Sequence, residues 1–189
     1  MKSRKSLFYK LKTPIFWCSK IIGILPNVLL QFIWDLTRPH SQLWFVFIRY
    51  IILKSRAKFC GDNIIVGANV TIKGMEKLTV GSNVSIHDNC YIDAGGVINI
   101  GSEVSIAHNS TLLSGTHTFE DYSLPIKYNP ITISGLTIKD DVWVGCGVRV
   151  LGGITIASRV VIAAGAVVNK SLDAKTLYGG IPAKKIKSI

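Results

Sequence analysis

His117 is the residue of this 189-residue chain best suited to acid–base chemistry. It lies in the stretch LLSGTHTFEDYSLPIKYNP, which interrupts an otherwise regular repeat. An imidazole exchanges its proton near neutral pH, so a histidine at the rim of a cleft can act as a general base. The other histidines are placed differently, because His40 lies in an N-terminal segment and His87 and His108 lie inside regular repeats. His117 is therefore the candidate for such chemistry, and the alternative is a satisfied surface histidine.

A catalytic histidine also needs a partner that turns its free nitrogen toward the proton it takes. Glu120 and Asp121 follow His117 closely, and either carboxylate could hold the ring. A backbone carbonyl could do the same, and either acid could instead be a plain loop charge or a sugar contact. The sequence leaves these alternatives open.

The spacing of cysteine and histidine does not predict a metal site. The four cysteines lie far apart, at Cys18, Cys60, Cys90 and Cys146. No CxxC or Cys/His pair has metal-binding spacing, and the spacing of the histidines does not indicate the three-histidine set of a zinc hydration centre. We therefore expect no metal, and free thiols in a reducing cytoplasm.

The elements that must position these residues follow a six-residue repeat. From Val66 onward an aliphatic residue returns at every sixth position, with two slips of two residues before the interruption, and a small or apolar residue falls four positions after it. This period fits neither an amphipathic helix nor a simple strand, but it fits short strands joined by tight corners and stacked as a solenoid. We expect each aliphatic residue to point inward. We expect the residue after it, often glycine, to lie near a corner where a positive φ is tolerated.

Residues 1–60 differ from the rest of the chain in composition and charge. They hold eleven basic residues against one acid, Asp35, a net charge of +10, whereas residues 61–189 carry +1. A surface-wide footprint for nucleic acid is therefore not expected. The apolar runs predict two or three short helices that contact a membrane surface peripherally or pack on the main domain or a neighbouring subunit. A spanning helix over residues 15–34 is weakened by Lys20 and Pro26.

Three sequence blocks carry a resemblance to one family: SGTHTFEDYSLPI, DDVWVGCGVRVLGGITI and VVIAAGAVVNKSLDAKTLYGGIPAKKI. Residues 62–187 resemble the hexapeptide-repeat acyltransferases, in particular the maltose, galactoside and nodulation-type O-acetyltransferases and their polysaccharide-modifying relatives. The resemblance implies an all-β solenoid, a left-handed parallel β-helix, assembled as a homotrimer. Residues 61–189 would form this domain, with a projecting loop at 117–133 and a short C-terminal tail, after an α-helical segment at 1–60.

The resemblance also implies roles for residues of this chain. His117 would be the general base, with Glu120 as its candidate orienter. Asp93 would contact the sugar or, alternatively, stabilise its own corner. Trp143 would pack near the thioester end of the cofactor or, alternatively, at a subunit interface. The residues implied for acetyl-CoA, laid between subunits, are Cys146, Gly147, Ala164, Gly165, Asn169, Lys170, Lys184 and Lys187. The last two would meet its phosphates, or lie in a solvated tail.

The expected function is transfer of an acetyl group from acetyl-CoA to a sugar hydroxyl. The basic N-terminal segment favours a surface polysaccharide or lipid-linked glycan precursor as the acceptor, modified in the cytoplasm at the inner face of the membrane. One alternative is an N-acyltransferase acting on an amino sugar carried by a nucleotide. The other is a solenoid that has lost catalysis.

Overall fold

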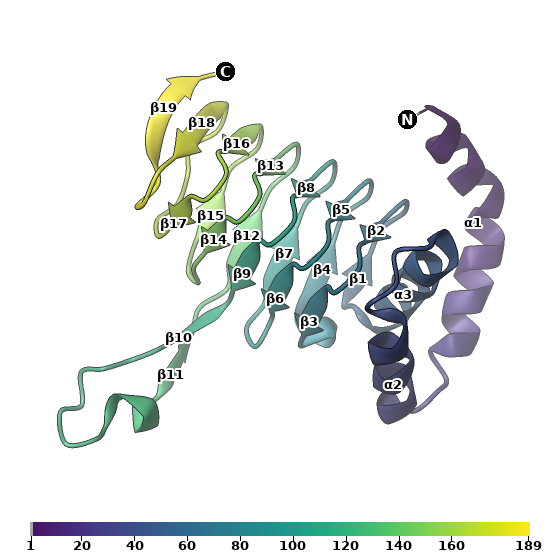
Figure 1. Ribbon diagram of the computed structural model, residues 1–189, viewed down its shortest axis with the longest axis horizontal. Helices are drawn as coiled ribbons and strands as arrows, with labels where there is room; N and C mark the ends of the chain where they lie inside the picture. The colour runs from purple at the N-terminus through teal and green to yellow at the C-terminus, as the bar shows by residue number, and fades with distance from the viewer. Residues whose placement is uncertain (1) are drawn as a thin grey trace.

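The chain forms three helices followed by a three-sided β-solenoid (Figure 1). The computed structural model describes residues 2–189, with side chains from residue 11 onward. The basic side chains of Lys2, Arg4, Lys5 and Lys10, which contribute to the predicted membrane contact, lie outside the described residues.

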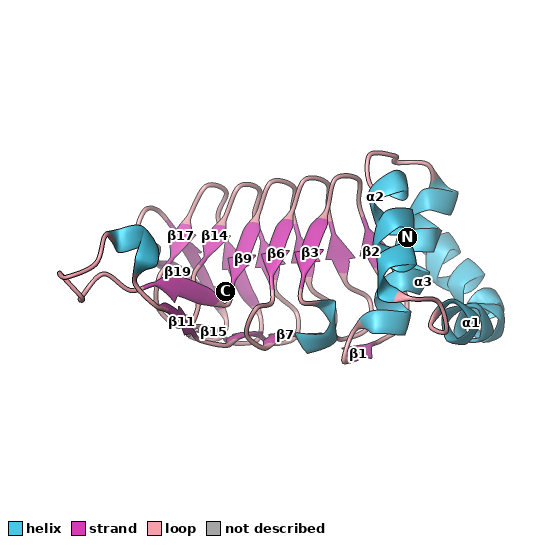
Figure 2. Ribbon diagram, turned by 90° about the horizontal axis from the view of Figure 1, so that it is seen from below, coloured by secondary structure: helices cyan, strands magenta, loops and turns pink. Residues whose placement is uncertain are grey.

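The helices are α1 (Lys2–Ile22), α2 (Asn27–Thr37) and α3 (Leu43–Arg56). They gather at one end of the solenoid, where α1 and α2 pack on α3 and α3 packs on the first strands (Figures 1 and 2). A turn after Ile22 divides the stretch considered as a spanning helix. Within the described part of the chain, no helix combines the length and the apolar character needed to cross a membrane.

Three parallel sheets, here named A, B and C, enclose the core of the solenoid. Sheet A contains β1 (Phe59–Cys60), β4 (Leu78–Val80), β7 (Ile98–Ile100), β12 (Leu136–Ile138) and β15 (Thr155–Ile156). Sheet B contains β2 (Ile65–Val66), β5 (Ser85–Ile86), β8 (Ser105–Ile106), β13 (Trp143–Val144), β16 (Val160–Ile162), β18 (Thr176–Gly179) and β19 (Lys184–Ser188). Sheet C contains β3 (Thr71–Lys73), β6 (Tyr91–Asp93), β9 (Thr111–Leu113), β14 (Arg149–Val150) and β17 (Val167–Val168). The chain passes from A to B to C in each coil, so the solenoid has three corner columns: edges AB, BC and CA.

The core is the one that the six-residue repeat predicts. Val66, Ile86 and Ile106 pair in register from coil to coil and are buried, as are Val144 and Ile162 above them. The small or apolar residue four positions after each aliphatic residue is also buried. These residues are Val84, Cys90, Val104, Ser110, Val148, Ile154, Val160 and Ala166. The expectation that the aliphatic residues point inward is confirmed, and the structure adds the residue four positions later to the core.

The expectation for the corner glycines was wrong in its reason. Positive φ angles fall two positions further on, often at asparagine, as at Asn63 and Asn83 on edge AB. The glycine that follows the aliphatic residue is needed because the next coil approaches it closely. A Cβ on Gly81 would lie 2.6 Å from the backbone carbon of Gly101, and one on Gly145 would lie 2.5 Å from the carbonyl oxygen of Ile162. Side chains are excluded at these positions by stacking, not by backbone conformation.

Edge CA is where the coils vary in length. Residue 66 pairs with residue 86, but residue 144 pairs with residue 162, so the early coils are two residues longer. The extra residues form the short helix η1 (Met75–Lys77) in the first coil. At the third coil the same edge carries the hairpin β10 (Gly115–His117) and β11 (Ile131–Ile133), with η2 (Ile126–Tyr128) between its strands. The repeat therefore breaks at the edge that already tolerates insertions.

The C-terminal tail is an ordered strand rather than a loose extension. Strand β19 pairs antiparallel with β18, the last parallel strand of sheet B, and closes the end of the solenoid (Figure 1). Because β18 would otherwise expose one row of backbone hydrogen-bonding groups, this pairing covers the sheet edge.

Candidate active site

The hairpin β10–β11 projects away from the solenoid and carries His117 at the end of its first strand (Figure 1). His117 lies opposite Ile131 in the antiparallel pair, and both residues are exposed. The buried Ser114 anchors the root of the hairpin, because its hydroxyl accepts the Gly96 N–H at 2.8 Å and donates to the Asp93 carbonyl at 2.7 Å. The imidazole therefore stands on a short strand fixed to the coil below it.

Asn129 organises the tip of the loop. It is buried, its Oδ1 accepts the Asp121 N–H at 3.0 Å, and its Nδ2 donates to the Asp121 carbonyl at 3.2 Å. The carboxylate of Asp121 accepts hydrogen bonds from the hydroxyl and backbone N–H of Ser123, and these bonds lower its pKa. The carboxylate of Asp121 thus stabilises its own turn. The sequence reasoning missed Asn129, whose place before Pro130 in a polar loop resembles an ordinary turn residue.

The orienter of His117 is not found within one chain. Among residues 11–189, no side chain or carbonyl is hydrogen-bonded to its ring, and Glu120 is exposed with no hydrogen bond or ion pair. The predicted pair of His117 and Glu120 therefore shares a loop without touching. The ring points to solvent, which leaves it open to a partner that comes from outside this chain.

Asp93 lies one coil below the hairpin, paired in register with Leu113. Its Oδ1 accepts the Gly95 N–H at 3.1 Å, and its Oδ2 lies 3.5 Å from the hydroxyl of Tyr91. Lys73, one coil lower, places its ammonium 5.5 Å from the centre of the Tyr91 ring. Asp93 thus stabilises its own corner, because both of its carboxylate oxygens accept from residues of its own coil.

Edge BC carries a column of residues suited to a ligand that lies along the coils. In the first three coils the corner has asparagine at positive φ, at Asn69, Asn89 and Asn109. In the next coils the same position is glycine, at Gly147 and Gly165, with φ of 68° and 72°. A Cβ on Gly165 would meet no heavy atom within 4 Å, and one on Gly147 would meet only Gly165 at 4.0 Å. Asparagine also adopts this φ, so the backbone conformation does not require glycine at these two corners. The missing side chain instead leaves open space beside the backbone.

The remaining predicted site residues divide between two edges. Cys146 and Ala164 accompany the two glycines on edge BC, and the Gly165 N–H donates to the Cys146 carbonyl at 2.8 Å. Trp143 lies on the outer side of sheet B and is 56% exposed. The exposed Asn169 and Lys170 follow β17 on edge CA, the edge of the hairpin. Lys184 and Lys187 are exposed on β19, beyond the last coil.

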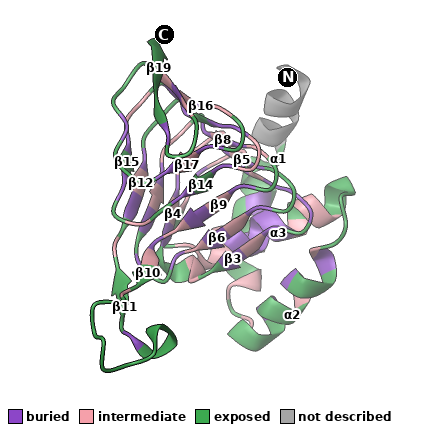
Figure 3. Cartoon of the chain, turned by 60° about the vertical axis from the view of Figure 1, so that its left-hand side comes forward, coloured by how far each residue is buried: buried purple, intermediate pink, exposed green. Residues whose placement is uncertain are grey.

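One chain therefore does not bring the predicted site together. His117, Asp93, Asn169 and Lys170 belong to edge CA, whereas the open glycines belong to edge BC, across sheet C. The register of the coils decides this division, which no local sequence signal reveals. The loop also leaves large apolar side chains uncovered, and Figure 3 shows almost the whole hairpin as exposed. These include Phe119, Tyr122, Ile126 and Tyr128.

The side chains described here provide no alternative metal chemistry. No group of three His, Cys, Asp or Glu residues within the described residues could hold an ion. All four cysteines are free thiols. Burial raises the pKa of Cys60 to about 12 and also raises the pKa of Cys90, so these two thiols are poor nucleophiles at neutral pH.

Comparison with known proteins agrees with the architecture. Residues 135–170 match the family described as bacterial transferase hexapeptide (six repeats). The chain is 28% identical over 155 residues to an Escherichia coli dTDP-4-amino-4,6-dideoxy-D-glucose acyltransferase, covering 68% of this chain and 81% of that protein. The first curated relatives it matches are longer proteins, since it spans 52% and 36% of the length of two of them.

Solved structures share most of the chain. A maltose O-acetyltransferase from Clostridium difficile 630 aligns with a TM-score of 0.78 at 28% identity, covering 89% of this chain and 88% of that one. A hexapeptide-repeat acetyltransferase from Vibrio cholerae, solved with acetyl coenzyme A, aligns with a TM-score of 0.75 at 25% identity, covering 84% of both chains. Together with the repeat, the core and the three-sided solenoid, these matches show that the chain belongs to the bacterial hexapeptide-repeat transferases, whose fold is the left-handed parallel β-helix.

Proposed function

We propose that the protein transfers an acetyl group from acetyl-CoA to a sugar hydroxyl, with His117 as the general base. The observation that carries the proposal is an exposed histidine on a fixed hairpin, in a solenoid whose other edge opens at Gly147 and Gly165. The similarity to a maltose O-acetyltransferase and to an acetyltransferase solved with acetyl-CoA supports it.

In the proposed reaction His117 removes the proton of the acceptor hydroxyl while its oxygen attacks the thioester carbonyl. The C–O bond forms, the carbonyl electrons move to oxygen, and the tetrahedral intermediate collapses with loss of the C–S bond. The imidazolium returns the proton to the leaving thiolate, so the ring ends neutral. Backbone N–H groups at the corners could stabilise the oxyanion, an effect worth about 3 kcal/mol for one donor.

The site requires a second protomer. If edge CA of one protomer faces edge BC of the next, His117 and the open glycine corners meet in a shared groove. A ring of three such heterologous contacts closes on itself and makes three identical sites. The uncovered apolar side chains of the loop, such as Phe119 and Tyr128, would then pack on the neighbouring subunit. We therefore propose a homotrimer.

We also propose that the acceptor is a glycan of a surface polysaccharide or its lipid-linked precursor, modified at the inner face of the membrane. The basic, apolar segment at 1–60 supports this choice over a free disaccharide, because such segments are attracted to anionic lipid.

A second candidate is N-acylation of an amino sugar carried by a nucleotide. It is favoured by the similarity to the dTDP-4-amino-4,6-dideoxy-D-glucose acyltransferase. The two reactions give different products, since an ester is cleaved by mild base and an amide is not.

The test uses the purified protein, labelled acetyl-CoA and candidate glycans. His117→Ala should reduce transfer by about 10²- to 10⁴-fold without changing CoA binding measured by calorimetry. His87→Ala is the matched control, because His87 is also an exposed corner histidine but lies on edge BC of an earlier coil. Full transfer by His117→Ala would overturn the proposed mechanism, and absence of CoA binding by the unaltered protein would point to a solenoid without catalysis.

A further inference from the structure

The outer sides of α1 and α2 and the turn between the two helices carry large apolar side chains that nothing in the described chain covers. We call this set the outer helical surface, and its members are Trp17, Ile21, Ile24, Val28, Phe32 and Leu36. Each of these side chains is between 61% and 83% exposed. We propose that this surface binds the headgroup and outer acyl region of a lipid bilayer, so that the protein works as a peripheral membrane protein.

Helical periodicity explains why these residues face outward. In α1 the buried side is at Ile15 and Ser19, and in α2 it is at Leu30 and Trp34. Residues about two positions further along a helix point to the opposite side. Both helices thus carry large apolar side chains on the solvent side as well as on the packed side, although Lys20, Gln31 and Asp35 are exposed among them. A solvent-facing helix is normally polar there, so the second apolar side indicates a further partner.

The helices are firmly attached to the solenoid, so this surface is part of the folded body. Arg49 is buried and donates to the carbonyls of Val66 and Thr37, and at 2.9 Å to that of His40. Lys54 donates to the Cys60 and Gly61 carbonyls at 3.0 Å. The surface should therefore meet a flat partner without rearranging.

Charge supports lipid rather than another protein as the occupant. Residues 1–60 carry +10, and their single acid, Asp35, already accepts from Gln31 and lies 3.9 Å from Arg38. Lys20 is exposed on α1 beside Trp17 and Ile21, as cations are in interfacial helices. Several other cations are used internally, including Arg49 and Lys54. Anionic lipid should add to binding through exposed cations such as Lys20, while most of the binding free energy comes from apolar contact, so high salt should weaken binding without abolishing it.

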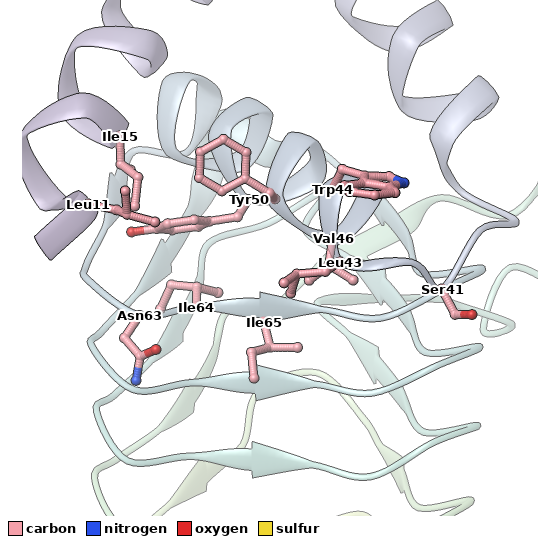
Figure 4. Close-up of a pocket in the computed structure, with 11 residues that line it drawn as sticks. Leu11, Ile15, Ser41, Leu43, Trp44, Val46, Tyr50, Asn63, Ile64 and Ile65 are labelled. Atoms are coloured by element: carbon pink, nitrogen blue, oxygen red, sulfur yellow. The ribbon is translucent and has the colours of Figure 1, made fainter. Parts of the chain in front are cut away.

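A groove between α1, α3 and β2 is also lined mainly by apolar side chains (Figure 4). Its volume is about 660 Å³, and its lining includes Leu11, Ile15, Leu43, Trp44 and Ile65. The hydroxyl of Tyr50 at its floor donates to the Gly61 carbonyl at 3.1 Å, so the walls offer mostly carbon. The apolar lining matches a lipid acyl chain in chemistry.

The proposal gains from the trimer of the proposed function, although it does not require it. Protomers packed side by side with parallel solenoids would place all three helical ends in one plane. Three weak contacts would then act together at one bilayer surface, which strengthens binding without any new contact.

The test is flotation of the full chain with vesicles of equal parts phosphatidylcholine and phosphatidylglycerol. The unaltered protein should float with the vesicles, and most of the binding should persist at high salt. The double variant Phe32→Ser, Leu36→Ser should bind about a hundredfold more weakly, because two large apolar side chains no longer leave water. Ile189→Ser is the matched control, since Ile189 is an exposed apolar residue at the other end of the solenoid.

Three outcomes would overturn the proposal: no flotation of the unaltered protein, equal binding by the double variant, or a double variant that changes oligomer size in light scattering. The last would assign the surface to contact between copies of the chain. Acetyl transfer to a soluble acceptor, measured in the same samples, separates this failure from failure of the proposed function. A second measurement tests the groove, with brominated phosphatidylcholine as a quencher of tryptophan fluorescence. The quenched fraction should be smaller in Trp44→Phe than in the unaltered protein, and it should not be smaller in Trp143→Phe. An equal decrease in both variants would exclude lipid from the groove.

Discussion

Gly165→Asn tests whether edge BC is the path of the cofactor. Asparagine occupies the equivalent corner in three earlier coils, with φ of 55°, 59° and 61° at Asn69, Asn89 and Asn109. Gly165 has a φ of 72°, and a Cβ there would have no heavy atom within 4 Å. The variant therefore copies a corner that this chain already builds, and it adds an amide side chain only to the open space.

The expected change in folding stability is small. Replacing glycine at a compatible conformation gains about 0.4–1 kcal/mol by restricting the unfolded chain. A left-handed conformation costs an ordinary L-residue about 1–2 kcal/mol, and asparagine less. The two effects nearly cancel, so the free energy of unfolding in urea should change by no more than about 1 kcal/mol.

The expected change in cofactor binding is large. The amide would fill the open space at Gly165, where we expect part of CoA to lie in the shared groove, so the dissociation constant for CoA should rise at least tenfold, equivalent to about 1.4 kcal/mol. Isothermal calorimetry with CoA measures this directly. Unchanged CoA affinity in a well-folded variant would refute the assignment of edge BC to the cofactor.

Gly145→Ala is the informative contrast on the same edge, one coil below Gly165. Its new Cβ would lie 2.5 Å from the Ile162 oxygen and 2.7 Å from the Ala164 nitrogen. The coils would have to separate, at a cost of about 2 kcal/mol, so this variant should lose stability. If the two variants were equally stable, the distinction between close-packed and open glycines would be wrong.

Three further predictions concern the rest of the molecule. Arg49→Met should lower the free energy of unfolding by about 3 kcal/mol in urea denaturation, because buried carbonyls lose a charged donor; a change below about 1 kcal/mol would contradict this. Partial burial acts to raise the pKa of Asp62, but Lys12 and Lys54 hold it below its ordinary value. The stabilisation is therefore complete above about pH 4 and lost as pH falls through the folded pKa, and Asp62→Asn should remove this acid dependence from thermal unfolding curves. Asn129→Ala should speed amide hydrogen exchange in residues 118–130 with little change elsewhere, and unchanged exchange there would show that its amide does not hold the loop.

Much of the fold could be predicted because the solenoid is a local structure. The aliphatic residue at each sixth position, from Val66 to Val168, faces the core in every coil, so the period alone specified sheets and interior. The interruption at residues 112–130, with a loop expected at 117–133, likewise predicted where an element projects from the solenoid. Repeats of this kind depend on neighbours in sequence and on one neighbouring coil, and both can be read along the chain.

The candidate site could be predicted only residue by residue. Glycine was correctly expected at corners, but sequence could not distinguish Gly145, excluded from carrying a side chain by the next coil, from Gly165, which faces open space. That distinction depends on distances between coils. The same holds for Asn129, whose buried amide closes the loop although its sequence context is that of an ordinary turn.

The amino-acid sequence by itself thus determined the solenoid, its core and the identity of the exposed histidine, because these follow from a short repeat and its single large interruption. Only the tertiary structure decided that His117 and the open glycines lie on different edges, since that depends on how many residues each coil contains. It also decided that α1 and α2 carry large apolar side chains on both sides, because the packed side of a helix is defined by what lies against it.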